Sequence, residues 1–190
     1  MEFPQKKQFM KSKSMMCATT YQLHKKNGII EKMKMNSPEK RKLMVAIIDF
    51  CKENGRLSLE KRFIQHGNCS VYKHSVNVAL MSLIIADMFS IRVDCSSLLR
   101  GAILHDYFLY DWHSHKGFPC THGFTHPFRA LKNAKEDFLL NAREVDIIVH
   151  HMFPLVPIPP FTKEGWIVCL ADKICAVYET FFARASERRE

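Results

Sequence analysis

Seven side chains that bind metals well recur along this 190-residue chain in the order H…HD…H…HH…D. They are His74, His105, Asp106, His126, His150, His151 and Asp172. Imidazole nitrogens and carboxylate oxygens suit divalent transition metals. Because a carboxylate has two oxygens, Asp106 can join the cation held by its neighbour His105 to a second cation. A set this large predicts a hydrolytic two-metal centre, since structural sites are usually closed by four ligands.

Each of these residues has an ordinary explanation when it is taken alone. A lone histidine such as His74 is more often a core or surface residue, and Asp172 could pair with Lys173 or Arg129. However, Asp172 and the two doublets interrupt apolar helical stretches, where a buried charge is costly unless it is paired or bound to metal. The combination therefore favours a metal centre. His24 and His66 are predicted to lie outside it, and His113, His115 and His122 are left open.

The elements that must position these side chains are predicted to be helices, because apolar residues recur at helical spacing. Capping residues mark their starts: Ser70 before one helix, Thr125 with Pro127 in the first turn of another, and Asn141 with Glu144 as a capping box. The expected helices cover about residues 38–54, 58–64, 71–88, 96–106, 126–134, 142–151 and 163–184. Residues 154–160 are too rich in proline to be helical. No alternating apolar run suggests a strand, so the predicted fold class is all-α.

The chain is predicted to have two parts of different character. Residues 1–36 are expected to form a basic, flexible arm, and residues 37–190 a single helical domain. Of the net charge of +9, most comes from residues 1–44, with eleven Lys/Arg against three Glu. Such an arm could contact nucleic acid, although a solvated arm is the simpler interpretation.

The cellular address is inferred from cysteines and hydropathy. The seven cysteines include no C-x-x-C pair, and no apolar stretch follows the basic N-terminus as in a secretory signal. No apolar run reaches the roughly 18 residues of a membrane helix. A cytoplasmic location and no contact with a membrane are therefore expected.

The chain resembles the HD-domain superfamily of metal-dependent phosphohydrolases, named for its His-Asp doublet, and in particular members with the extended ligand set. The resemblance is carried by the segments SVYKHSVNVA, LLRGAILHDYFLYDW, GFTHPFRAL, DIIVHHMFP and CLADKICAVYE. It implies a compact helical bundle. It also implies a first cation held by His74, His105, Asp106 and Asp172. Asp106 would bridge to a second cation held by His126, His150 and His151.

The activity that this resemblance implies is hydrolysis of a phosphomonoester or phosphodiester by a hydroxide bridging two divalent cations, with His105 and Asp106 as catalytic residues. Iron or manganese is favoured, with zinc, cobalt and nickel as further candidates. The expected partner is a small phosphorylated substrate, with nucleotides among the candidates. Arg129, one turn after His126, and Lys173, next to Asp172, are the expected substrate-binding residues.

Two alternatives remain open, and one specificity is set aside. Some HD-fold enzymes are mixed-valent di-iron oxygenases, but they resemble a set with one histidine in place of His150-His151. A non-catalytic binding module stabilised by metal is the second alternative. Phosphodiesterases of the HD-GYP type carry Gly-Tyr-Pro after the histidine pair, where this chain has MFPLVPIPPF. Specificity for cyclic di-GMP is therefore not inferred.

Overall fold

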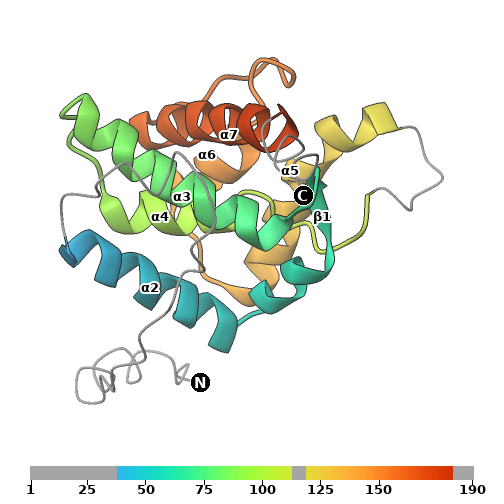
Figure 1. Cartoon of the computed structure of the whole chain (residues 1–190), viewed down its shortest axis with the longest axis horizontal. Helices are drawn as coiled ribbons and strands as arrows, with labels where there is room; N and C mark the ends of the chain where they lie inside the picture. The colour runs from blue at the N-terminus through green and yellow to red at the C-terminus, as the bar shows by residue number, and fades with distance from the viewer. Residues whose placement is uncertain (1–37, 113–118, 182–190) are drawn as a thin grey trace, which may run out of the picture.

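The computed structural model describes residues 38–112 and 119–181. These residues form a bundle of α-helices with one 3₁₀-helix and one short hairpin (Figure 1). The elements are α2 (Pro38–Glu53), η3 (Leu57–Arg62), β1 (Ile64–His66), β2 (Cys69–Ser70), α3 (Val71–Met88), α4 (Cys95–Leu104), α5 (Pro119–Asp137), α6 (Ala142–His150) and α7 (Lys163–Phe181). The all-α prediction is confirmed. The predicted arm, residues 1–36, lies outside the described residues.

The expectation of no strand is wrong for the hairpin of β1 and β2, which pair antiparallel. Gly67 lies between them with φ of +56°, a conformation that glycine adopts without steric cost. The two strands are too short for an alternating pattern to show in the sequence.

Side-chain caps set the starts of three helices. At α3, Ser70 Oγ accepts a hydrogen bond from the Lys73 amide, as predicted. The capping box at α6 is also confirmed, with Asn141 and Glu144 each accepting from the other's backbone amide. Asp94 caps α4 by accepting from the Ser97 amide at 3.0 Å, so this helix starts slightly earlier than expected.

The predicted start of α5 at Thr125 is wrong, because the helix begins at Pro119 and continues through Pro127. Proline in a helix interior costs a hydrogen bond, which is why the sequence suggested a first-turn position. Tertiary packing overrides this preference, since His126 and Pro127 are both buried.

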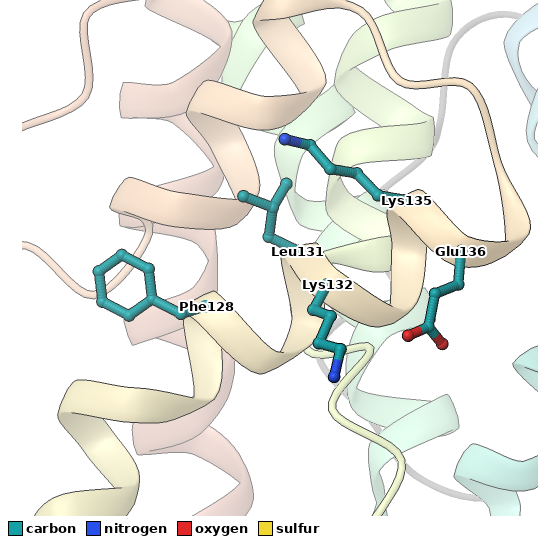
Figure 2. A pocket seen from close by; sticks show the side chains of 5 residues that line it. All are labelled: Phe128, Leu131, Lys132, Lys135 and Glu136. Atoms are coloured by element: carbon teal, nitrogen blue, oxygen red, sulfur yellow. The ribbon is translucent and has the colours of Figure 1, made fainter.

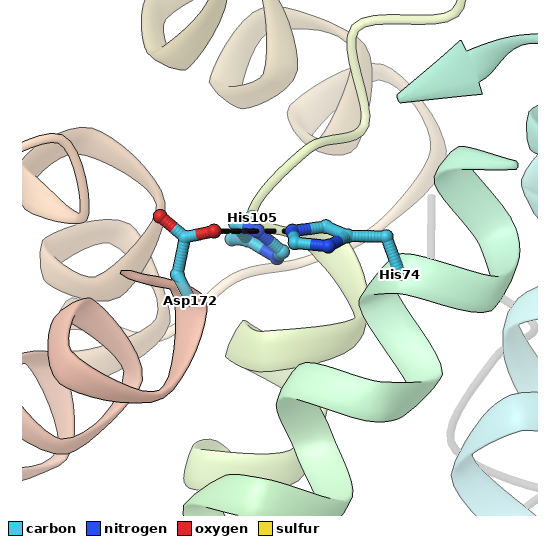
Figure 3. A group of neighbouring side chains, drawn as sticks. All are labelled: His74, His105 and Asp172. Atoms are coloured by element: carbon cyan, nitrogen blue, oxygen red, sulfur yellow. Dashed lines mark hydrogen bonds and ion pairs between the residues drawn. The ribbon is translucent and has the colours of Figure 1, made fainter. Parts of the chain in front are cut away.

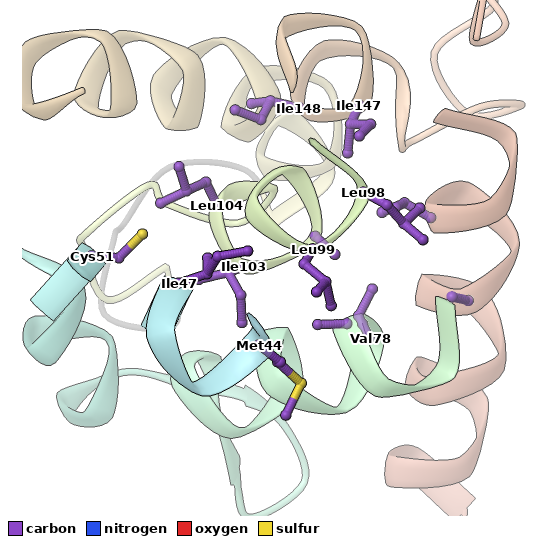
Figure 4. Close-up of a cluster of buried hydrophobic side chains, with 14 of the residues drawn as sticks. Met44, Ile47, Cys51, Val78, Leu98, Leu99, Ile103, Leu104, Ile147 and Ile148 are labelled. Carbon is purple, nitrogen blue, oxygen red and sulfur yellow. The ribbon is translucent and has the colours of Figure 1, made fainter. Parts of the chain in front are cut away.

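The hydrophobic core centres on α4, which packs against α2, α3, α6 and α7. Leu98, Leu99, Ile103 and Leu104 of this helix have no solvent exposure and contact apolar side chains from its neighbours (Figure 4). The core therefore fixes the C-terminal end of α4, where the His-Asp doublet follows.

The segment between α6 and α7 contains no helix, as its prolines predicted. None of the described helices is both long and apolar enough to cross a membrane. The cellular compartment stays a prediction.

Candidate metal centre

Five helices bring six of the seven predicted ligands to one buried place. His105 and Asp106 directly follow α4, and His151 directly follows α6. The three others come from within helices: His74 from α3, His126 from α5 and Asp172 from α7. All six side chains are buried. Residues far apart in the sequence therefore share one site.

One group of ligand atoms joins α3, α7 and the end of α4 (Figure 3). His74 Nε2 lies 3.0 Å from Asp172 Oδ1, and His105 Nε2 lies 3.8 Å from the same oxygen. The ligand atoms of these three residues all lie within 4.8 Å of one another, which is close enough to hold one cation.

A second group surrounds Asp106. Its Oδ1 lies 3.2 Å from His126 Nε2 and 3.6 Å from His151 Nε2, and these two nitrogens are 2.8 Å apart. His105, Asp106 and His151 also have ligand atoms within 4.8 Å of one another. His105 thus belongs to both groups.

The four histidines of the site share one hydrogen-bonding pattern. Their Nδ1 atoms are occupied: His105 bonds the Ala102 carbonyl at 2.8 Å, and His126 and His151 bond the carbonyls of His122 and Ile148, each at 2.9 Å. His74 Nδ1 bonds Glu179 Oε2 at 2.8 Å. With Nδ1 donating, a neutral imidazole presents a lone pair on Nε2, which is the usual arrangement of metal-binding histidine.

The ligand atoms of the site lack a positively charged partner, which a bound cation would supply. The buried atoms His105 Nε2 and Asp106 Oδ1 accept no hydrogen bond in the described part of the chain. In their neutral forms, His126 and His151 direct two lone pairs at each other. Buried polar groups are normally satisfied, so the donor set fits divalent metal ions.

The electrostatics of the metal-free site also keep several ligands in binding form. Burial raises the pKa of Asp106 and Asp172, but neighbouring histidines outweigh it and hold both below the ordinary range. Burial and the charges of His105 and His126 lower the pKa of His151 to about 3. Ionised carboxylates and neutral imidazoles are the forms that bind metal.

His105 and His74 differ, because a proton competes with metal for each. Burial lowers the pKa of His105, but Asp106 and Asp172 outweigh it and raise the pKa. The balance at His74 is similar. Burial lowers its pKa, but hydrogen bonds to Asp172 and Glu179 outweigh this effect and raise the pKa to about 10. Metal binding at Nε2 must therefore displace a proton there at neutral pH.

Comparison with known families agrees with this geometry. Residues 71–177, more than half of the chain, match the HD domain, and this span contains all six converging ligands. The chain belongs to the HD-domain family. The superfamily comprises metal-dependent phosphohydrolases, and HD domains bind divalent metals. Searches of the curated proteins and of the solved structures returned no match.

Two residues that orient ligands of the candidate metal centre were not predicted from the sequence. Glu179 of α7 accepts from His74 and also from Asn77 Nδ2 at 2.9 Å. It follows Asp172 by seven residues, or about two helical turns, and this spacing could have revealed it. Gln65 of β1 donates to Asp106 Oδ2 at 2.6 Å. It could not be placed from sequence because the hairpin was not expected.

The structure does not bring His150 together with the other six. Its Nδ1 lies 2.8 Å from Asp146 Oδ1, and its ring packs edge-on against Phe161. Consecutive helical residues differ by about 100° around the axis, which explains why His151 points into the centre and His150 does not. The assignment of His150 as a ligand stays a prediction without geometric support.

The two expected substrate-binding residues are in different situations. Arg129 is exposed, and its guanidinium lies over the ring of Tyr110, 4.8 Å from the ring centre. The Lys173 ammonium donates to the carbonyls of His151 and Cys169 and to Cys169 Sγ. Lys173 therefore stabilises the backbone at His151. The role of each residue toward substrate stays a prediction.

A stack of rings leads outward from the second ligand group. His126 stacks on His122 with ring centres 4.7 Å apart, and His122 stacks on Trp112 at 4.9 Å. Tyr110 Oη lies 2.8 Å from His122 Nδ1. His122, left open by the sequence, is thus the neighbour of a candidate ligand. His113 and His115 lie outside the described residues.

A shallow hollow of about 500 Å³ lies along the outer face of α5 (Figure 2). It is lined by Phe128, Leu131, Lys132, Lys135 and Glu136, and none of the candidate ligands lines it. The hollow is therefore separate from the metal centre.

Proposed function

We propose that this HD domain is a metal-dependent phosphohydrolase that cleaves a phosphomonoester or phosphodiester bond in a small molecule, with nucleotides among the candidate substrates. The observation that carries the proposal is the convergence of four imidazole Nε2 atoms on the carboxylates of Asp106 and Asp172. Asp106 favours two cations rather than one, because its Oδ2 lies 3.5 Å from His105 Nε2 while its Oδ1 lies 3.2 Å from His126 Nε2. Imidazole and carboxylate ligands suit Mn, Fe, Co, Ni and Zn, and among these we propose iron or manganese because the resemblance to the extended ligand set implies them.

His74, His105 and Asp172 would hold one cation, and Asp106, His126 and His151 the other. Bound divalent cations supply Lewis-acid charge to phosphate oxygens and a water nucleophile at neutral pH. The chain fixes the ligands for this role. Gln65 holds Asp106 Oδ2, which directs Oδ1 toward His126 and His151.

We propose that the substrate contacts the outer side of the second ligand group, which consists of Asp106, His126 and His151. Arg129 offers an exposed guanidinium, which suits the oxygens of a phosphate. Lys173 already donates three hydrogen bonds, so we assign it to support of His151 instead.

The test is to load the purified chain separately with Mn, Fe(II), Co, Ni and Zn and to assay hydrolysis of p-nitrophenyl phosphate, bis(p-nitrophenyl) phosphate and a nucleotide panel without dioxygen. We expect hydrolysis with Mn or Fe(II). Asp106→Asn should lower kcat by about 10²-fold or more, as loss of a key electrostatic group does. Asp49→Asn, at an exposed position of α2, is the matched control and should keep full activity.

A folded, metal-loaded protein that hydrolyses none of these compounds would contradict the proposal. Turnover that requires dioxygen would support the oxygenase alternative instead.

A further inference from the structure

The solvent-facing side of α7 is apolar from Trp166 to Phe181. Its exposed residues recur at intervals of four, four, three and four, so they form one stripe. They are Trp166 (48% exposed), Leu170 (48%), Ile174 (40%), Val177 (55%) and Phe181 (68%). The opposite side of α7 is buried in the core. A helix that is apolar all round is normally buried on all sides.

Charged residues do not interrupt this α7 stripe. Of the charged residues of α7, Glu164, Asp172 and Glu179 are buried, and Lys173 donates to the carbonyl of His151. The exposed Lys163 is the first residue of the helix and precedes the stripe. The exposed side of α2 is different, because Arg41, Lys42 and Asp49 surround Val45 there. An uninterrupted apolar surface of this kind marks an interaction site.

We propose that a second copy of this chain covers the α7 stripe, through antiparallel pairing of the two α7 helices about a two-fold axis near Ile174. The stripe is symmetric about that point. Trp166 and Phe181 lie seven or eight residues on either side of it, and Leu170 and Val177 lie three or four. Antiparallel pairing therefore sets Trp166 against the partner's Phe181, and Leu170 against the partner's Val177. Two-fold pairing joins one surface patch to itself.

Spacing, size and charge favour this occupant. Intervals of three and four residues keep side chains on one face of a helix, so two such helices can interlock along a seam. Each partner in a stable pair contributes roughly 600–1,000 Å². The segment before α7 adjoins the stripe, because Phe153 packs edge-on against Trp166, and its exposed Leu155, Ile158 and Phe161 add apolar surface toward this order. Residues 1–37 carry eight lysines, for which the stripe offers no carboxylate partner. Figure 1 shows α7 along one edge of the bundle.

The experiment is sedimentation velocity on the metal-loaded full chain over a concentration series. We expect a species of twice the 22.1 kDa chain mass. Val177→Glu should weaken the pair at least tenfold, because two charges would be buried in the seam. Val45→Glu is the matched control, since this valine of α2 is similarly exposed at 44%. It should leave the pair intact.

A cross-linking measurement tests the register. Ile174→Cys places the new thiol next to its copy at the axis, so mild oxidation should give a covalent dimer. Val45→Cys should give no more than the background of the native cysteines. Circular dichroism and metal content should match the unchanged protein in every variant.

Three outcomes would overturn the proposal: a monomer at every concentration, a pair that survives Val177→Glu, or equal cross-linking at positions 45 and 174. If the protein is a monomer and Val177→Glu exposes residues 1–37 to protease, that segment is the occupant instead.

Discussion

Glu179 controls which nitrogen of His74 can bind a cation. Its Oε2 accepts from Nδ1 at 2.8 Å, which leaves Nε2 directed at Asp172. Such carboxylate–histidine pairs orient the ring and raise its basicity as a ligand. Glu179 is itself held by Asn77, so the orientation of His74 depends on a chain of hydrogen bonds across α3 and α7.

We predict that Glu179→Ala lowers metal affinity about 10–100-fold, as loss of such a partner typically does. The physical reason is that His74 loses the acceptor that selects its tautomer. Chelator-competition titration measures this affinity. Glu179→Gln keeps an acceptor oxygen and should recover part of it. Glu164→Ala is the control on the same helix, because Glu164 is equally buried but accepts from the Asp94 amide.

Unchanged metal affinity in Glu179→Ala would show that His74 needs no carboxylate partner. A loss of affinity in Glu164→Ala of the same size would indicate general damage to α7 instead.

At the scale of elements, the distance between α4 and α6 sets the distance between the doublet and His151. The helices approach closely at Gly101, where a Cβ would lie 2.4 Å from Ile147 Cδ1 and 3.0 Å from its Cγ2. A side chain at this position would push α4 away from α6. Glycine is thus required here by packing, although it is a poor helix former.

We predict that Gly101→Ala destabilises the fold by up to about 2 kcal/mol, because overpacking costs about 1–3 kcal/mol and the gain in helix propensity offsets about 1 kcal/mol of it. Urea unfolding measures the loss. The double variant with Ile147→Val lacks the nearest methyl group and should recover part of it. Additive effects in the double-mutant cycle would mean that the two positions do not clash.

At the scale of the whole molecule, Asp137 joins three distant parts of the chain. Its carboxylate accepts from Arg56 Nε at 2.9 Å and from Tyr107 Oη at 2.7 Å. Tyr107 follows Asp106 directly, and Asn133 holds the Tyr107 carbonyl at 3.0 Å. The turn that carries the doublet is therefore tied both to α5 and to the end of α2.

This network predicts how stability depends on pH. Burial raises the pKa of Asp137, but the hydrogen bonds from Arg56 and Tyr107 outweigh it and hold the pKa below the ordinary 3.8. A carboxyl with a lowered folded-state pKa stabilises the fold above its unfolded pKa, and this contribution is lost as pH falls through the folded-state value. Asp137→Asn should therefore cost about 1–3 kcal/mol at pH 7.

The cost should start to shrink as pH falls below about 4, because the carboxyl of the unfolded chain binds a proton there, and it should vanish only below the lower folded-state pKa. Urea unfolding of both proteins at pH 7, 4 and 3 measures the difference. Asp49→Asn provides the control for a surface carboxylate. A cost that stays constant with pH would show that the charge of Asp137 does not contribute.

The sequence determined the helices, the caps at Ser70 and Asn141, and the kinds of ligand at the centre. These properties are local, because apolar periodicity and side-chain-to-amide bonds act within a few residues. Tertiary structure decided that His151 and not His150 turns inward, that α5 continues through Pro127, and that Gln65 and Glu179 orient the ligands. A periodic pattern shows which residues share a face, but only packing decides what each face meets.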